Sequence, residues 1–221
     1  MQNTTQLLMI QPVNFGFNEQ TAVNNSFQRN IGAAVQQSAL QEFNAFVEVL
    51  RTNKIDVTVV EDSLLPQTPD SIFPNNWISF HADGSIFLYP MFAENRRLER
   101  KPAVLDAIRA RFSVGRIIDL TKYETTGSFL EGTGSMVLDR ENKIAFACLS
   151  PRTNETVLDE FCKLAGYKSI TFKAVDQNDI EIYHTNVMMC VAKTFAVVCL
   201  ESVTYEEEKA DLLNSLKQTG K

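Results

Sequence analysis

Residues 183–190 read Tyr183-His184-Thr185-Asn186-Val187-Met188-Met189-Cys190 and place one of the two histidines of the chain at the start of an apolar run. A histidine titrates near neutral pH, so this side chain is a candidate general base. Two earlier stretches have the same form, with polar or acidic residues before a hydrophobic strand. They are Phe73-Pro74-Asn75-Asn76-Trp77-Ile78-Ser79-Phe80 and Leu130-Glu131-Gly132-Thr133-Gly134-Ser135-Met136-Val137-Leu138. If the three stretches are equivalent positions of a repeated unit, their polar side chains meet at one centre.

The segments around these stretches repeat in the order hairpin, helix, strand. The first unit has strands Trp77–Phe80 and Ile86–Tyr89 around an Asp-Gly turn, a helix over Ala93–Phe112 that breaks before Pro102, and a strand Arg116–Leu120. The second has strands Ser135–Leu138 and Ile144–Cys148, a helix Asn154–Ala165 and a strand Tyr167–Phe172. The third has strands Val187–Ala192 and Phe195–Leu200 and a helix Thr204–Lys217. The units start 58 and 52 residues apart, a period typical of supersecondary units stacked around an axis.

The beginning and end of the chain depart from this repeat. The chain opens with a strand Leu7–Ile10, an irregular stretch Gln11–Asn25, a helix Ser26–Arg51, a strand Val57–Val60 and a proline-rich loop Ser63–Pro74. Only one strand precedes the first helix, and the third unit stops at Lys221 without its last strand. We therefore expect one domain over residues 1–221 that lacks the C-terminal part of a longer fold. Unpaired strand edges would favour self-association into a homo-oligomer.

Composition and charge exclude several classes of protein. The 221 residues are 44% hydrophobic and 22% charged, which is ordinary for a globular protein. A net charge of -6 argues against a nucleic-acid partner, and the basic cluster Arg96, Arg97, Arg100 and Lys101 is interpreted as a solvated helix face. No targeting signal or membrane-length apolar run is present, so we expect a cytoplasmic protein without a membrane partner.

The four cysteines form no Cys-x-x-Cys pair and lie mostly in apolar runs. The pattern favours neither a metal site nor a disulfide framework, and it predicts that Cys148, Cys162, Cys190 and Cys199 are core residues. Residues 127–134 contain three glycines but lack the Lys-Ser/Thr ending of a phosphate-binding loop, and we expect them to lead directly into a strand.

The three stretches, together with Pro12-Val13-Asn14-Phe15-Gly16-Phe17-Asn18, resemble the citrulline-utilisation hydrolases of the amidinotransferase and arginine deiminase superfamily. The resemblance covers the whole chain. It implies a pentein, an α/β propeller of five hairpin-helix-strand units, of which this chain would hold about four. It also implies a C–N hydrolase without a cofactor, in which a histidine and a glutamate assist a nucleophilic cysteine.

Carried over residue by residue, the resemblance makes His184 and Glu131 catalytic. It places Asn76 and Asn186 where the guanidine-modifying branches usually have aspartate. Asparagine amides suit a neutral ureido group better than buried carboxylates would, so the predicted substrate is citrulline or a related arginine-like small molecule. The predicted substrate-binding residues are Asp70, Phe73, Asn75, Asn76, Trp77 and Asn186.

The nucleophile is the main departure from the family pattern. The family cysteine lies near the C-terminus after a glycine-rich stretch, and nothing in residues 204–221 matches it. We therefore expect the nucleophile beyond this chain, and we expect the chain alone to be inactive. The alternative is a non-catalytic binding protein that keeps the pocket. Two structural interpretations also stay open, because His184 could simply bond a backbone carbonyl and Trp77 could belong to the core.

Overall fold

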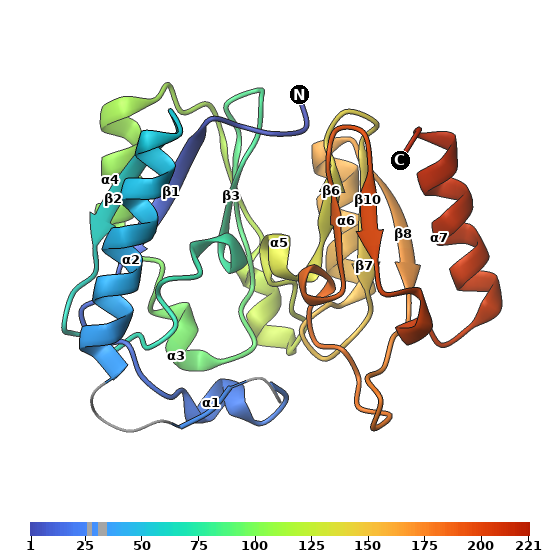
Figure 1. Cartoon of the computed structure of the whole chain (residues 1–221), viewed down its shortest axis with the longest axis horizontal. Helices are drawn as coiled ribbons and strands as arrows, with labels where there is room; N and C mark the ends of the chain where they lie inside the picture. Colours follow the sequence, from blue (N-terminus) through green and yellow to red (C-terminus); the bar gives the residue numbers. More distant parts are fainter. Residues whose placement is uncertain (26–27, 31–34) are drawn as a thin grey trace. The chain divides into compact units, whose positions relative to one another are not determined.

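The computed structural model describes residues 1–25, 28–30 and 35–221. The chain divides into two compact units (Figure 1). The N-terminal unit comprises residues 4–86 and 93–117, and the C-terminal unit comprises residues 1–3, 87–92 and 118–221. Within the described ranges, no helix has both the length and the apolar composition of a membrane span.

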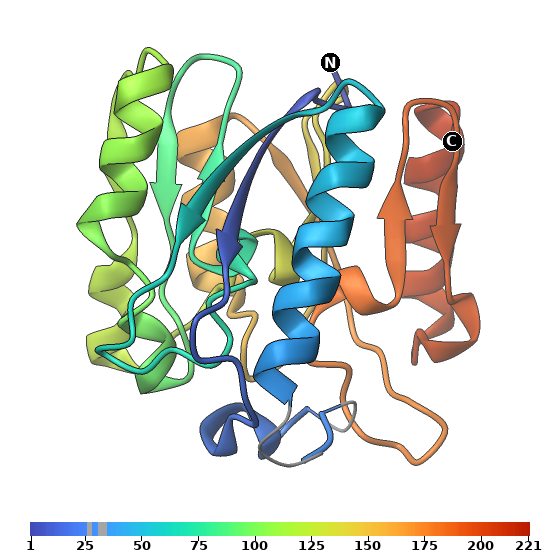
Figure 2. The same ribbon diagram turned by 60° about the vertical axis from the view of Figure 1, so that its left-hand side comes forward.

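A parallel strand pair begins the N-terminal unit. Strands β1 (Gln6–Gln11) and β2 (Asp56–Glu61) pair along their whole length. Helix α2 (Val35–Thr52) connects them and packs against β2, as Figure 2 shows. Parallel neighbours need a crossover of this kind, because a tight turn cannot bring the chain back in the same direction.

Two expectations for the segment before α2 are wrong in the described residues. The stretch expected to be irregular contains a short helix, α1 (Glu19–Ala22), which Asn18 caps by accepting the N–H of Gln20 at 3.1 Å. Helix α2 begins at Val35, and residues 28–30 are not helical. The expected start at Ser26 lies outside the described residues.

The first hairpin and the helices after it follow the prediction closely. Strands β3 (Ile78–Phe80), β4 (Ile86–Leu88) and β5 (Ile117–Asp119) form a three-stranded sheet in that order. The division between the two units passes through β4 and β5. The expected long helix is two helices, α3 (Glu94–Arg97) and α4 (Pro102–Arg111), with Pro102 at the first position of the second. Proline has no N–H to donate, and the first position of a helix needs none, so Pro102 can begin α4.

The second repeat lies entirely in the C-terminal unit. Strands β6 (Val137–Asp139) and β7 (Ile144–Cys148) are antiparallel, and β8 (Lys168–Phe172) pairs in parallel with β7. Helix α6 (Glu155–Ala165) makes the crossover between a capping Asn154 and a left-handed Gly166. Side chains of β7 alternate between two cores, because successive strand residues point to opposite faces: Ala145 and Ala147 pack with α6, and Phe146 and Cys148 pack on the other face.

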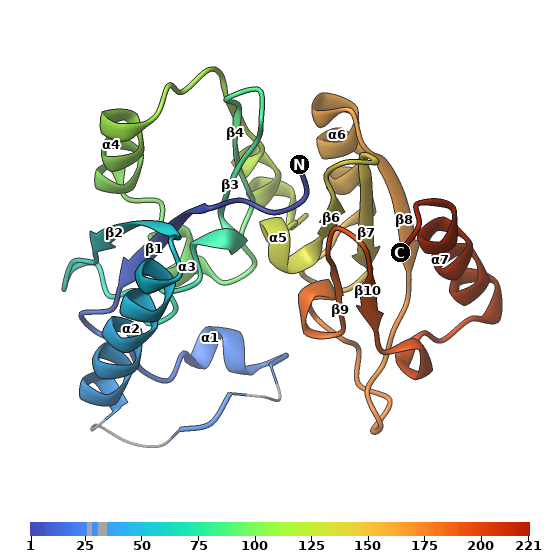
Figure 3. The same cartoon turned by 45° about the horizontal axis from the view of Figure 1, so that its top comes forward.

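The third repeat covers that other face. Strands β9 (Met189–Val191) and β10 (Ala196–Val198) form an antiparallel pair, and α7 (Glu206–Gln218) follows. Leu212 and Leu216 of α7 pack with Phe172 of β8. Figure 3 shows α6 and α7 flanking β8. In the described residues the strands form four open sheets, and none closes on itself.

A short helical turn precedes each hairpin, which the sequence did not predict. The turns are η1 (Pro74–Asn76), α5 (Gly132–Ser135) and η3 (Thr185–Val187). The strands therefore start at Ile78, Val137 and Met189, one or two residues later than expected. The expectation that residues 127–134 lead directly into a strand is wrong for the same reason. Two further 3-10 turns, η2 (Thr121–Thr126) and η4 (Leu200–Ser202), follow β5 and β10.

Candidate active site

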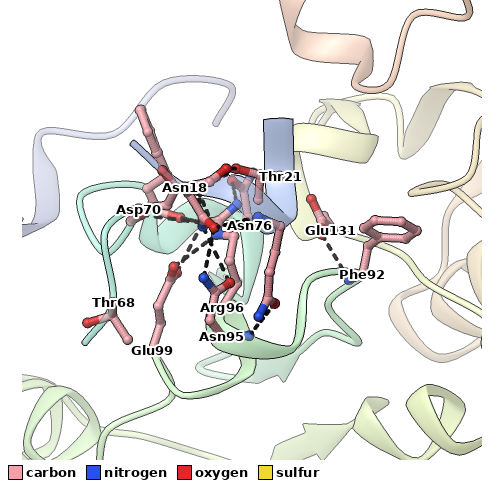
Figure 4. A network of polar contacts seen from close by, with 12 residues as sticks. Asn18, Thr21, Thr68, Asp70, Asn76, Phe92, Asn95, Arg96, Glu99 and Glu131 are labelled. Carbon is pink, nitrogen blue, oxygen red and sulfur yellow. Dashed lines mark hydrogen bonds and ion pairs between the residues drawn. The ribbon is translucent and has the colours of Figure 1, made fainter. Parts of the chain in front are cut away.

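The C-terminal unit brings Glu131 and His184 together. Glu131 stands immediately before α5 and His184 immediately before η3, and Oε2 of the glutamate lies 2.7 Å from Nε2 of the imidazole. Both side chains are buried. The other carboxylate oxygen accepts the backbone N–H of Phe92 at 3.0 Å, which is drawn in Figure 4. The carboxylate thus fixes the orientation of the ring through this hydrogen bond.

A buried arginine shares the same carboxylate. Nη1 of Arg152 lies 3.5 Å from Oε2 of Glu131, and the Arg152 side chain is 2% exposed. Its guanidinium lies over the Tyr183 ring at 4.8 Å and over the Phe92 ring at 5.7 Å. These ring faces and the carboxylate compensate a cation that would otherwise be costly to bury. Sequence reasoning missed Arg152, because it lies in the loop between β7 and α6 and belongs to none of the three stretches.

Two hydroxyl groups hold the elements that carry the pair. Ser135 Oγ accepts the N–H of Glu131 at 2.8 Å and donates to the carbonyl of Arg152 at 2.7 Å. Thr185 Oγ1 donates to the carbonyl of Ser135 at 2.5 Å and accepts the N–H of Cys148 at 2.8 Å. These four buried bonds connect α5, η3, β7 and the Arg152 loop. Isolated serines and threonines carry no pattern in the sequence that could have revealed this role.

A second polar cluster lies in the N-terminal unit around Arg96 (Figure 4). Its guanidinium donates to both carboxylate oxygens of Glu99, at 2.9 and 3.0 Å, and to Oδ1 of Asn76 at 2.8 Å. Arg96 is 3% exposed, so the expected solvated face is wrong for this residue. It is also wrong for Lys101, which is largely buried and bonded to Asp62 and Thr68. Each buried cation is compensated by a carboxylate: Glu99 lies three residues after Arg96, whereas Asp62 is 39 residues from Lys101 in the sequence.

Asp70 belongs to the same cluster. Its Oδ2 accepts hydrogen bonds from Asn18 Nδ2 at 2.8 Å and Thr21 Oγ1 at 3.1 Å, and lies 3.9 Å from Nε of Arg96. Asn18 therefore does more than serve a turn, because its amide joins α1 to the loop that carries Asp70. The role of Asp70 at the charged end of a substrate stays a prediction.

The remaining predicted residues differ in exposure. Phe73 is 46% exposed, Asn75 is half-buried and Asn186 is exposed. Trp77 is 1% exposed and forms part of the core, as its structural interpretation expected. Asn76 is buried beside Arg96. That the polar residues of the three stretches share one centre stays a prediction.

The cysteines divide into two kinds. Cys148 and Cys162 are buried, and burial raises the pKa of each thiol to about 12. These thiols stay protonated at neutral pH and are poor nucleophiles. Cys190 and Cys199 are exposed, so their expected place in the core is wrong: Cys190 lies on the outer side of β9, and Cys199 follows β10. The described residues contain no group of histidines, cysteines and carboxylates that could hold a metal ion.

Comparison with known families gives a match over nearly the whole chain. The family described as N,N-dimethylarginine dimethylhydrolase, eukaryotic, matches residues 11–221. The curated proteins contain no match to the chain.

Solved structures match in fold at low sequence identity. ArgZ, an arginine dihydrolase from the ornithine-ammonia cycle in cyanobacteria, is 14% identical with a TM-score of 0.75, and the match covers 97% of this chain and 30% of ArgZ. The N-terminal domain of ArgZ bound to product is 14% identical with a TM-score of 0.74, covering 97% of this chain and 73% of that domain. A dimethylarginine dimethylaminohydrolase in an adduct with 4-chloro-2-hydroxymethylpyridine is 16% identical with a TM-score of 0.62, covering 93% of this chain and 73% of that enzyme. The chain thus has the mixed α/β fold of these pentein-type enzymes and spans less than a third of the length of ArgZ.

Proposed function

Because the chain belongs to the family of eukaryotic N,N-dimethylarginine dimethylhydrolases, we propose that it provides the acid–base half of a hydrolase for C–N bonds in an arginine-derived small molecule. The observation that carries the proposal is the buried hydrogen bond of 2.7 Å between His184 and Glu131. An imidazole held by a buried carboxylate can take up a proton and return it, which C–N hydrolysis requires at each of its two steps. The supporting relatives are an arginine dihydrolase and a dimethylarginine dimethylaminohydrolase.

In the proposed mechanism a cysteine thiolate attacks the carbon of the ureido group, a C–S bond forms and one C–N bond breaks, which leaves a thiocarbamate on the cysteine. His184 gives its proton to the departing nitrogen and then takes one from the water that hydrolyses the intermediate. Glu131 stabilises the imidazolium and accepts a hydrogen bond from a terminal nitrogen of the substrate. We place the thiolate on a cysteine outside residues 1–221, because the buried thiols Cys148 and Cys162 remain protonated and neither exposed cysteine, Cys190 or Cys199, matches the position of the family cysteine.

The substrate group that we propose is the neutral ureido group of citrulline. Asn76 and Asn186 supply amides rather than carboxylates, and amides do not need a cation to compensate them. Asp70 would receive the ammonium at the other end of the substrate, and Phe73, Asn75 and Trp77 would shape its surroundings.

A second candidate is a binding protein that holds the ligand without turnover. It is favoured by the same thiols: in the described chain the two buried cysteines are protonated, and the two others are exposed, Cys190 on β9 and Cys199 just after β10. This candidate predicts ligand binding without product.

One experiment tests both functions. The purified chain is incubated with citrulline, arginine and N,N-dimethylarginine, products are quantified by mass spectrometry, and binding is measured by calorimetry. His184→Ala should weaken binding or turnover at least about tenfold, since it removes a buried charge-assisted partner. His81→Ala is the matched control, because His81 lies in the β3–β4 turn and bonds Ser79. Product formation supports the hydrolase but means that a thiol within residues 1–221 is the nucleophile. Binding without product supports the second candidate and is also expected of a hydrolase whose cysteine lies outside these residues, whereas neither binding nor product refutes both.

A further inference from the structure

The Arg96 cluster fixes the orientation of the Asn76 amide. Arg96 donates through Nη1 to Oδ1 of Asn76, so the carbonyl end of that amide faces the guanidinium. The NH2 end then points the other way as a hydrogen-bond donor. Among the described residues, Nδ2 of Asn76 takes part in no hydrogen bond, although the residue is 5% exposed.

Arg96 is itself held in a fixed plane. Glu99 binds its Nε and Nη2 in a two-point contact that a lysine could not reproduce. The backbone carbonyls of Asp70 and Phe73 accept from the same Nη2 at 3.5 and 3.3 Å. Because the loop before η1 is tied to the guanidinium in this way, the Asn76 amide cannot rotate without breaking the bond to Nη1.

We propose that Arg96 is a positioning residue that determines substrate specificity, because it presents Asn76 as a donor and so selects a carbonyl-bearing ureido group over a guanidinium. A guanidinium has only N–H donors and no acceptor, so it would face the donors of Asn76 unfavourably. A ureido oxygen accepts from them. This inference rests on the proposed function, since it assigns the substrate class of the same site.

The cluster charge does not make this choice. Arg96 carries one positive charge, and Glu99 and Asp70 carry two negative charges beside it. The excess negative charge attracts the ammonium that citrulline and arginine share and also the guanidinium of arginine, so charge alone cannot favour citrulline. Discrimination between them therefore depends on whether Asn76 presents a donor or an acceptor.

The test compares the dissociation constants of arginine and citrulline by calorimetry on the whole chain. Asn76→Asp replaces the donor by an oxygen of the same shape and should shift the preference toward arginine by at least about tenfold. Arg96→Lys removes the two-point contact and should reduce the preference for citrulline several-fold. The controls are Asn53→Asp, which makes the same charge change at an exposed site on the turn after α2, and Arg109→Lys, which alters an exposed ion pair with Asp106.

Each outcome is decisive. A shift in both variants with neither control changed supports the inference. If Arg96→Lys keeps the wild-type ratio, the positioning role of Arg96 is overturned. If Arg96→Lys does not fold, as judged by circular dichroism, Glu99→Gln takes its place, because it weakens the two-point contact that holds Arg96, and an unchanged ratio in that variant overturns the inference. If both ligands bind and the ratio in Asn76→Asp equals that in Asn53→Asp, the inference is overturned while the proposed function stands. If the wild-type chain binds neither ligand, the proposed function fails and the inference fails with it.

Discussion

Replacing Glu131 by glutamine should destabilise the C-terminal unit strongly. The carboxylate is fully buried and contacts three groups: the His184 imidazole at 2.7 Å, the Arg152 guanidinium at 3.5 Å and the Phe92 N–H at 3.0 Å. Glutamine keeps the shape and one acceptor oxygen, so the bond to Phe92 can remain. The substitution removes the negative charge that compensates Arg152, and it places an NH2 donor where Oε2 accepted.

The expected cost follows from these contacts. Removing one partner of a buried ion pair costs about 3–5 kcal/mol, because the other charge stays buried without compensation. The retained bond to Phe92 and the rings of Phe92 and Tyr183 over Arg152 favour the lower end of that range. We expect a loss of about 3 kcal/mol, which for a chain of this size lowers the midpoint of thermal unfolding by roughly 6–12 °C.

The assay is urea unfolding at neutral pH, followed by circular dichroism and by hydrogen exchange of peptides from the C-terminal unit. Glu124→Gln is the matched control, since Glu124 is half-buried and accepts the backbone N–H of Met91, the residue before Phe92, at 2.9 Å. It should cost about 1 kcal/mol or less. If the two variants differ by less than about 1 kcal/mol, Glu131 does not compensate a buried charge and the reasoning is wrong.

Three further predictions concern other buried groups. The thiols fall into a buried and an exposed pair, namely Cys148 with Cys162, and Cys190 with Cys199. Native protein should therefore react with two equivalents of iodoacetamide and unfolded protein with four, as measured by intact mass. Burial raises the pKa of the buried pair from 9.0 to about 12, so the stability that these two thiols contribute is complete below pH 9 and is lost as the pH rises toward 12. Thermal unfolding across that pH range checks this loss. Burial raises the pKa of Asp62, but its hydrogen bonds, with that from Lys101 the largest, outweigh burial and hold the pKa below 3.8. The stability that Asp62 contributes is therefore present above about pH 4 and is lost as the pH falls. Asp62→Asn should make the urea midpoint depend less on pH on the acid side of a pH series. Thr185→Val should cost about 2 kcal/mol by urea unfolding, because it removes two buried hydrogen bonds, and a cost under about 0.5 kcal/mol would contradict the hydroxyl contacts.

Local signals predicted the elements that local chemistry controls. The Asp-Gly turn marked the β3–β4 hairpin, Pro102 marked the start of α4, and the helix expected over Asn154–Ala165 is α6. Helix α1 escaped prediction because it depends on a single capping side chain, and one asparagine among many carries no distinct signal.

Long-range pairing is what the sequence could not show. Arg96 reads as one of four basic residues in a short segment, and only the folded loop reveals the carbonyls of Asp70 and Phe73 that meet its guanidinium. Thr185 contacts Ser135 across 50 residues, and no periodicity predicts such a bond. The association of Glu131 with His184 was predictable only because both stretches carried the same pattern.

The sequence pattern matched Asn76 with Glu131 and His184, but in the structure Asn76 occupies a different position relative to its helical turn. Glu131 and His184 both occupy the position that caps a short helical turn, before α5 and η3 respectively, and this equivalence brings their side chains together. The residue in the same position before η1 is Phe73, whereas Asn76 is the last residue of that turn. In a strand, successive side chains would alternate between the two faces of the sheet. In a helical turn such as η1, the capping residue Phe73 and the last residue Asn76 point in different directions. Asn76 therefore bonds Arg96 and not a group equivalent to Glu131, and its proposed part in specificity depends on that guanidinium rather than on its place in the repeat.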